Sequence, residues 1–178
     1  MEQPPIYTIG HGRRPVADFI SLLRAPGIQY LADVRSTPFS RFNPQYNQPA
    51  LQAALAAHNI RYVYMGDMLG GRPADPALYD AGGRVNYDLV SATPFFQQGI
   101  ARLKKAYAQK LLLAIMCSES DPRCCHRSRL IGQALISEGV ALLHIDEHGQ
   151  LQTQAAILPE ADNVLYFNSR TRHKRKTR

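Results

Sequence analysis

The segment from Cys117 to Arg127 contains the densest group of chemically active side chains in this sequence. Its residues are Cys-Ser-Glu-Ser-Asp-Pro-Arg-Cys-Cys-His-Arg, and they lie between an apolar run and an amphipathic stretch. A cysteine thiolate attacks electrophiles or binds metal ions, and a nearby histidine or arginine lowers the pKa of the thiol. The segment therefore predicts a site in which cysteine is the central group.

The second half of this segment is expected at the start of a helix. Asp121 followed by Pro122 is typical of an N-cap and a first helical position. The stretch that follows has helical period, with an inward face of Leu130, Ile131, Ala134 and Leu135. Backbone N–H groups at a helix start favour anions and thiolates. We expect these conditions to act on Cys124, Cys125, His126 and Arg127.

Thiol chemistry is the leading hypothesis for this segment. The catalytic candidates are Cys117, Cys125, His126 and Glu119. Either cysteine would be the nucleophile, and the histidine or the glutamate would move protons. Arg127, together with Arg35 from an earlier part of the chain, would hold an anionic group on a phosphate-bearing ligand such as a nucleotide or nucleic acid.

Three alternatives stay open at this point. In the first, Cys117 is a small buried apolar residue and Glu119 forms a structural ion pair with Arg127. In the second, zinc is bound by ligands drawn from Cys117, Cys124, Cys125, His126 and His11, although their spacing matches no common zinc pattern. In the third, the site binds a ligand without catalysis.

Polar residues also follow other apolar runs of the chain, each time directly after an expected strand. His11 follows the first run, and Asp33, Arg35 and Ser36 follow the second. Carboxyl ends of parallel strands meet at one edge of a sheet, and ligands bind beyond that edge. We therefore expect these residues to converge with Cys117. The expected ligand-binding residues are His11, Asp33, Arg35, Ser36, Arg41 and Arg127.

The loop from Ser36 to Phe42 raises nucleic acid as a partner. It combines hydroxyl groups, a cation and aromatic rings, as surfaces that stack bases do. A packed loop without a ligand explains the same composition. The corresponding alternative function is a non-catalytic nucleic-acid-binding module that uses this loop and the basic C-terminal tail.

Short apolar runs alternate with amphipathic stretches along the chain. The expected strands are residues 6–9, 30–34, 61–65, 111–116 and 141–145, and helical period is found around residues 16–23, 51–55, 95–103 and 130–135. This alternation predicts a single α/β domain with an open, mostly parallel sheet flanked by helices, Rossmann-like and three-layered. Thr37 to Asn47 and Gly66 to Asn86 are expected to be long loops that cover a site. Residues 147–150 are expected to form a turn that leads into a short hairpin.

The net charge of +7 is concentrated at one end of the chain. Arg170, Arg172, Lys174, Arg175, Lys176 and Arg178 account for most of it, so the rest is near neutral. We expect one domain over residues 1–168 and a disordered basic tail over 169–178, which either solubilises the protein or tethers it to nucleic acid. The odd set of crowded cysteines, the start of the chain and the lack of a long apolar run predict a cytoplasmic protein without a membrane partner.

Several of these motifs, in the same order, resemble the domain of unknown function 488 family. The matching blocks are Ile9-Gly10-His11, Gly27-Ile28, Asp33 to Arg41, Leu69-Gly70-Gly71, and Cys117 and Glu119 with Cys125-His126-Arg127. Cys124 and the basic tail lie outside this pattern. The resemblance implies an α/β fold and supports the site, and it implies no particular reaction.

Overall fold

Strands of the described range, residues 3–158, form one sheet in the computed structural model. They are β1 (Ile6–Gly10), β2 (Tyr30–Asp33), β3 (Arg61–Tyr64), β4 (Leu113–Cys117), β5 (Leu142–Ile145) and β6 (Leu151–Thr153). Their order is β3-β2-β4-β1-β5-β6. All neighbours pair in parallel except β6, which is antiparallel to β5. The predicted α/β fold with a mostly parallel sheet is confirmed.

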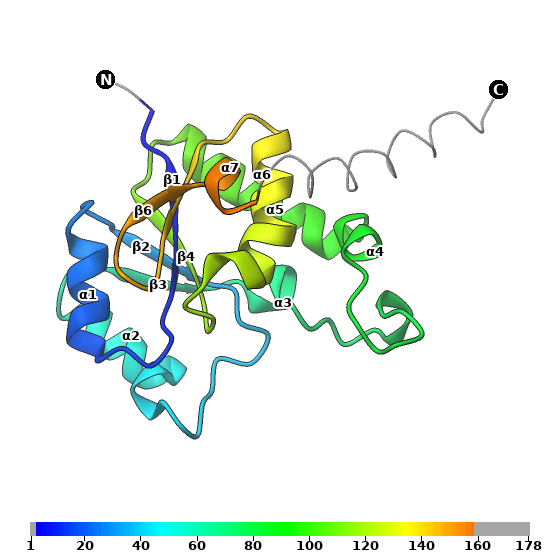
Figure 1. Cartoon of the computed structure of the whole chain (residues 1–178). Coiled ribbons are helices and arrows are strands. Elements are labelled where there is room, and N and C mark those ends of the chain that lie inside the picture. The colour runs from blue at the N-terminus through cyan, green and yellow to red at the C-terminus, as the bar shows by residue number, and fades with distance from the viewer. Residues whose placement is uncertain (1–2, 159–178) are drawn as a thin grey trace.

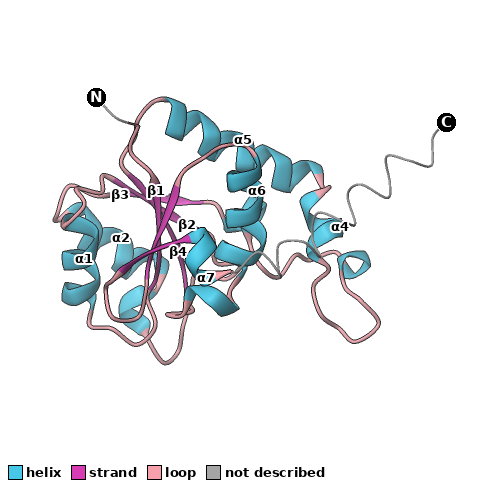
Figure 2. Ribbon diagram, turned by 45° about the horizontal axis from the view of Figure 1, so that its top comes forward, coloured by secondary structure: helices cyan, strands magenta, loops and turns pink. Residues whose placement is uncertain are grey.

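Helices cover both faces of this sheet (Figure 1). They are α1 (Val16–Arg24), α2 (Gln48–Ala56), α3 (Gly66–Leu69), α4 (Tyr87–Ser91), α5 (Pro94–Ala108), α6 (Gln133–Ser137) and α7 (Gln154–Ile157). A π-helical segment, Arg127–Gly132, leads directly into α6. Figure 2 shows the strands between the α1 and α2 layer and the layer that contains α5 and α6.

Successive side chains of β4 pack against opposite helix layers. Ala114 and Met116 pack into the core below α1 and α2, whereas Ile115 and Cys117 face the core formed with α5 and α6. Strands buried on both faces are apolar throughout, which explains the continuous apolar runs in the sequence. As a consequence, the Cys117 side chain points toward the layer that also carries the π-helical segment.

The structure corrects the start of one predicted strand and shows regular structure inside both predicted loops. β4 begins at Leu113 rather than at residue 111, because Lys110 has a positive φ of 57° and the Leu111 amide caps α5 by donating to Ala106. The predicted loop from Gly66 to Asn86 contains the helical turn α3, a 3-10 turn at Pro76–Leu78 and a bridge between Tyr79 and Val85. A 3-10 turn at Pro44–Tyr46 likewise lies in the other predicted loop.

The hairpin expected after β5 is present. Asp146 donates its amide to the Gln150 carbonyl oxygen at 3.0 Å, and Gly149 has the positive φ of 78° that the turn requires. Within residues 3–158, no helix combines the length and apolar character that a membrane crossing requires. The predicted domain boundary at residue 168 and the basic tail at 169–178 lie outside the described residues.

Candidate active site

Cys125 lies at a break between two helical segments. Asp121 caps a 3-10 turn, Pro122–Cys124, by accepting a hydrogen bond from the Arg123 amide. Cys125 then has an extended backbone, with φ −121° and ψ 161°, before the chain enters the π-helical segment. The single continuous helix expected from Pro122 onward is therefore wrong. The break places the Cys125 thiol at the start of the second segment, where the backbone N–H groups of Arg127 and Ser128 stabilise its thiolate.

Arg127 is completely buried and packs against this thiol. Its Nε donates to Cys125 Sγ at 3.1 Å, and one terminal nitrogen donates to Thr8 Oγ1 at 3.0 Å. The other terminal nitrogen donates to the carbonyl oxygens of Glu119 and Ser120, each at 3.0 Å. The guanidinium is thus committed to protein groups, a position that differs from the ligand contact predicted for it. Here it holds Cys125 in place and stabilises its negative charge.

The two buried cysteines have opposite pKa shifts. Burial opposes ionisation of Cys125, but a hydrogen bond from the Cys117 thiol, the Arg127 charge and two backbone N–H groups outweigh it and lower its pKa to about 6. Burial, followed by the hydrogen bond to Cys125, raises the pKa of Cys117 well above its ordinary value. These opposite shifts favour Cys125 over Cys117 as the thiol of the pair that ionises first.

Arg35 is fixed by a buried carboxylate at the end of β2. Its Nε and one terminal nitrogen donate to Asp33, with a shortest distance of 2.6 Å, and the same terminal nitrogen donates to the Tyr46 carbonyl oxygen at 2.9 Å. Tyr62 donates its hydroxyl to Asp33 at 2.7 Å. Asp33 is completely buried and fixes the position of Arg35. The remaining terminal nitrogen of Arg35 faces His11 Nε2 at 3.4 Å.

His11 joins the site from the end of β1. Its Nδ1 donates to the Gly12 carbonyl oxygen at 2.9 Å, and its ring stacks on Tyr46 with centroids 4.2 Å apart. Burial, despite the Gly12 hydrogen bond and with help from the Arg35 charge, lowers the pKa of His11. The imidazole is thus neutral near neutral pH, with the unprotonated Nε2 directed at Arg35.

His126 and Glu119 differ in their access to the thiols. His126 Nε2 donates to the Val34 carbonyl oxygen at 3.1 Å, and burial lowers the pKa of this ring. Its other side packs on Gly71, where a Cβ would lie only 2.8 Å from the ring. Burial opposes ionisation of Glu119, but its contact with the Cys117 thiol helps to outweigh burial and lowers the pKa of the Glu119 carboxyl. Glu119 is therefore the better placed of the two to exchange a proton with the cysteines.

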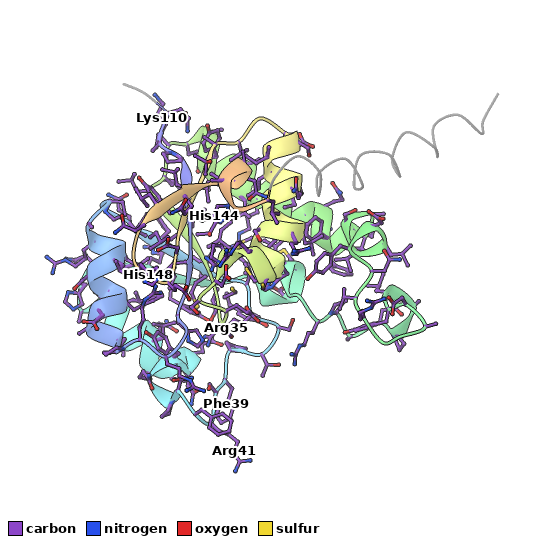
Figure 3. The ribbon with its side chains drawn as sticks, viewed as in Figure 1. Arg35, Phe39, Arg41, Lys110, His144 and His148 are labelled. Carbon is purple, nitrogen blue, oxygen red and sulfur yellow. The ribbon has the colours of Figure 1, made fainter. Side chains whose placement is uncertain are left out.

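A cavity of about 420 Å³ lies beyond the carboxyl ends of β2 and β4 and is lined by part of this group of residues. Its wall includes both buried cysteines together with Arg35, Ser36, Arg72, Glu119 and His126. The convergence expected from the sequence is present, since His11, Arg35 and Cys117 belong to one contiguous site. Arg41 is not part of that wall, and Figure 3 shows it at the outer end of its loop, away from Arg35. The catalytic and ligand-binding roles of all these residues stay predictions.

Metal binding was one alternative for the cysteine segment. Across residues 3–158, no three side chains of His, Cys, Asp or Glu are grouped so that they can hold a metal ion. Cys124 is exposed, whereas Cys117 and Cys125 are buried against each other and against Arg127. The side chains grouped at the cysteine segment are therefore two thiols and a guanidinium.

A buried network behind Arg127 contains functional candidates that the sequence patterns did not indicate. Thr8 Oγ1 donates to His144 Nδ1 at 2.7 Å, His144 Nε2 donates to Gln154 Oε1 at 2.7 Å, and Gln154 donates to the Ser128 carbonyl oxygen at 3.1 Å. Thr8 and His144 are register partners on β1 and β5. A polar residue in the middle of each of two apolar strands was the signal that could have identified them.

Comparison with known proteins identifies a family. The family model described as domain of unknown function DUF488 matches residues 15–134, which is more than half of the chain. The matched region includes Arg35, the two glycines at 70 and 71, and the whole cysteine segment, and it begins shortly after His11. No curated protein and no solved structure matches.

Proposed function

Since this chain belongs to the DUF488 family, whose description names no activity, we propose a function from the site itself. The protein is an enzyme in which the Cys125 thiolate is the nucleophile and the ligand is anionic and phosphate-bearing. The sequence leaves both Cys117 and Cys125 as candidates for the nucleophile, and this proposal assigns the role to Cys125. The observation that carries the proposal is the 3.1 Å contact between Arg127 Nε and Cys125 Sγ at the wall of a cavity.

A buried arginine against a thiol supports nucleophilic chemistry. A guanidinium that is always charged stabilises the anionic form of its partner and not the neutral form, so it shifts the thiol toward thiolate. A purely structural cysteine needs no strong donor, because a neutral thiol is stable in an apolar core. The cost of burying Arg127 is therefore better explained by an ionised sulfur than by packing alone.

The cations of the cavity support an anionic ligand. Asp33 occupies two nitrogens of Arg35 and leaves the third directed along the site, where it meets only the neutral His11 ring at a long distance of 3.4 Å. Arg72, which is exposed, lies on the same cavity wall. Guanidinium groups bind phosphate oxygens through charge-assisted hydrogen bonds. Glu119, in contact with Cys117, is the proposed proton carrier.

Alkylation by iodoacetamide tests the nucleophile. We expect the wild type to show one fast-reacting thiol whose rate follows an ionisation near pH 6, the value to which the Cys125 pKa is lowered. Peptide mass spectrometry should place the label on Cys125, and Cys125→Ser should remove the fast reaction. Cys124→Ser is the matched control, since Cys124 is exposed and the fast reaction should persist without it. A fast reaction that survives in Cys125→Ser would refute the proposal.

Inorganic phosphate tests the anion site. If the ligand is anionic, phosphate should slow the alkylation of Cys125, and Arg72→Gln should weaken that protection severalfold. Arg72 is preferred over Arg35 for this test, because removal of Arg35 leaves the buried Asp33 carboxylate unpaired and destabilises the fold. Arg102→Gln, an exposed change on α5, removes the same charge elsewhere and should leave protection intact.

A further inference from the structure

A second cavity adjoins the first, and Phe39 lines both of them. It has a volume of about 590 Å³ and is lined by His11, Arg13, Ser40 and Asn43, among others. Phe39, Ser118 and Glu119 line both cavities. The two hollows therefore adjoin beside the cysteine site and share a wall that includes Phe39, and together they are called the groove.

The charges along this groove are mostly positive. Arg35 and Arg72 line the first cavity, and Arg13 lines the second. Among the residues that line the two hollows, Glu119 is the one carboxylate. Cations in both cavities fit a ligand with more than one negative charge along its length, since each phosphate of such a ligand meets its own guanidinium.

Aromatic rings on this loop are exposed without an obvious structural reason. Phe39 is 62% exposed and Phe42 is 93% exposed. Exposed Arg41 lies between them in the sequence, and Figure 3 shows Phe39 and Arg41 projecting from the loop away from the body of the protein. Base faces stack on such rings regardless of sequence, and neighbouring arginines add electrostatic attraction to the backbone.

Hydrogen bonds on both flanks of Phe39 hold the backbone of this loop in the conformation that exposes the ring. The Ser40 amide donates to Asn47 Oδ1 at 2.6 Å, and the Asn43 amide donates to Ser40 Oγ at 3.0 Å. The Pro38 carbonyl oxygen accepts from the Gln48 amide, which begins α2, at 3.0 Å. These bonds anchor the loop on both flanks of the ring, and a preorganised platform loses less entropy when it binds a ligand.

We propose that this groove binds single-stranded nucleic acid, with a base stacked on Phe39 and flanking phosphates on Arg13 and on Arg35 or Arg72. A duplex presents only the edges of its bases in its grooves, so it has no free base face to stack on the Phe39 ring. A single nucleotide would occupy one hollow and leave the cations of the other without a partner. The inference deepens the proposed function and rests on it, because it names the ligand that passes the Cys125 thiolate.

Fluorescence anisotropy with a labelled oligonucleotide of about ten nucleotides tests this groove, a length within the usual site sizes of single-strand binders. With the full chain, Phe39→Ala should weaken binding about tenfold, the usual effect of removing one stacking ring, whereas Phe39→Tyr, which keeps the ring, should bind like the wild type. Leu151→Ala is the matched control, because Leu151 is also exposed, at 54%, but lies on β6 outside the groove. Equal binding by Phe39→Ala and Leu151→Ala would overturn the inference.

Two further measurements separate this inference from related explanations. A mononucleotide that binds as tightly as the oligonucleotide would overturn the single-strand assignment. Replacement of Lys174 and Lys176 by Gln should lower the salt dependence and leave the Phe39 effect unchanged. Cys125→Ser should still bind the strand, so binding by this variant together with an unreactive Cys125 in the wild type would refute the proposed enzyme and leave the groove in place.

Discussion

The two buried cysteines of the site interact with each other and have pKa shifts of opposite sign. Cys125 receives hydrogen bonds from Cys117, from Arg127 and from two backbone amides, whereas Cys117 lies in a fully buried position beside that negative charge. Two like charges at contact distance are strongly unfavourable, so only one thiol of such a pair ionises near neutral pH. The proton retained by Cys117 therefore stabilises the thiolate of Cys125.

Changing Cys117 should alter the pKa of Cys125 in a way that depends on the new side chain. Cys117→Ala removes the S–H donor and should raise the Cys125 pKa by about one unit, the size of one hydrogen bond to a charged group. Cys117→Ser keeps a donor and should leave the pKa nearly unchanged. The measurement is the pH dependence of Cys125 alkylation. Loss of all fast alkylation in both variants would instead identify Cys117 as the reactive thiol.

At the scale of elements, the tightest approach between β1 and the segment after β4 that a glycine permits is at Gly10. A Cβ on Gly10 would lie 1.6 Å from the Glu119 carbonyl oxygen, which also accepts a hydrogen bond from Arg127. Gly10→Ala must therefore displace backbone, and we expect a loss of about 3 kcal/mol in the free energy of unfolding, as for severe overpacking. Urea unfolding measures this loss, and the displaced carbonyl should also raise the Cys125 pKa.

A second glycine provides the control for that change. A Cβ on Gly82 would have the flexible Asp80 carboxylate oxygen as its nearest neighbour, at 3.2 Å. Gly82→Ala should therefore leave the free energy of unfolding within about 0.5 kcal/mol of the wild type, as for most surface changes. If both alanine variants lost the same stability, the close approach at Gly10 would not be its cause.

The elements themselves were largely predictable from the sequence. Runs such as Leu113–Cys117 are apolar on both faces because helices cover both, and this pattern is visible without a structure. The polar residues at the carboxyl ends of β1, β2 and β4 could be placed together for the same reason, since parallel strands align those ends. Topology therefore made the convergence of His11, Arg35 and Cys117 foreseeable.

The local geometry of the cysteine segment was not foreseeable in the same way. Asp121-Pro122 favours a helix start, but it caps only a 3-10 turn, and the chain extends at Cys125 before the helix resumes. Arg127 was expected to hold an anionic ligand at the start of this helix. Its burial depends on acceptors from Glu119 and Ser120 in the preceding turn and from Thr8 on β1, and the contact with Thr8 is one that no local pattern encodes.

At the scale of the whole molecule, one buried network joins the sheet to the site. It runs from Arg127 through Thr8 on β1 and His144 on β5 to Gln154 at the start of α7, which returns to the Ser128 carbonyl oxygen. Each group in this hydrogen-bond network has a defined donor or acceptor role only while His144 is neutral, with its proton on Nε2. Burial, with the Arg127 charge, accordingly lowers the pKa of His144 to about 4, despite the hydrogen bond to Gln154.

This network should make the fold acid-sensitive through His144. His144 has an ordinary pKa of 6.5 in the unfolded chain and a pKa of about 4 in the folded protein. As the pH falls, the unfolded chain therefore binds the proton at a higher pH than the folded protein does. The stabilisation from neutral His144 is therefore fully present above about pH 6.5 and is lost as the pH falls toward 4, by roughly 2 kcal/mol for this group between about pH 7 and pH 4.5.

The variant His144→Gln tests this prediction. It keeps hydrogen-bonding groups and cannot titrate, so its urea-unfolding free energy should fall less over that interval. It should not become independent of pH, because burial lowers the pKa of His11 and His126 in the same direction. Equal losses in the wild type and His144→Gln would show that protonation of His144 does not limit the acid stability of the fold.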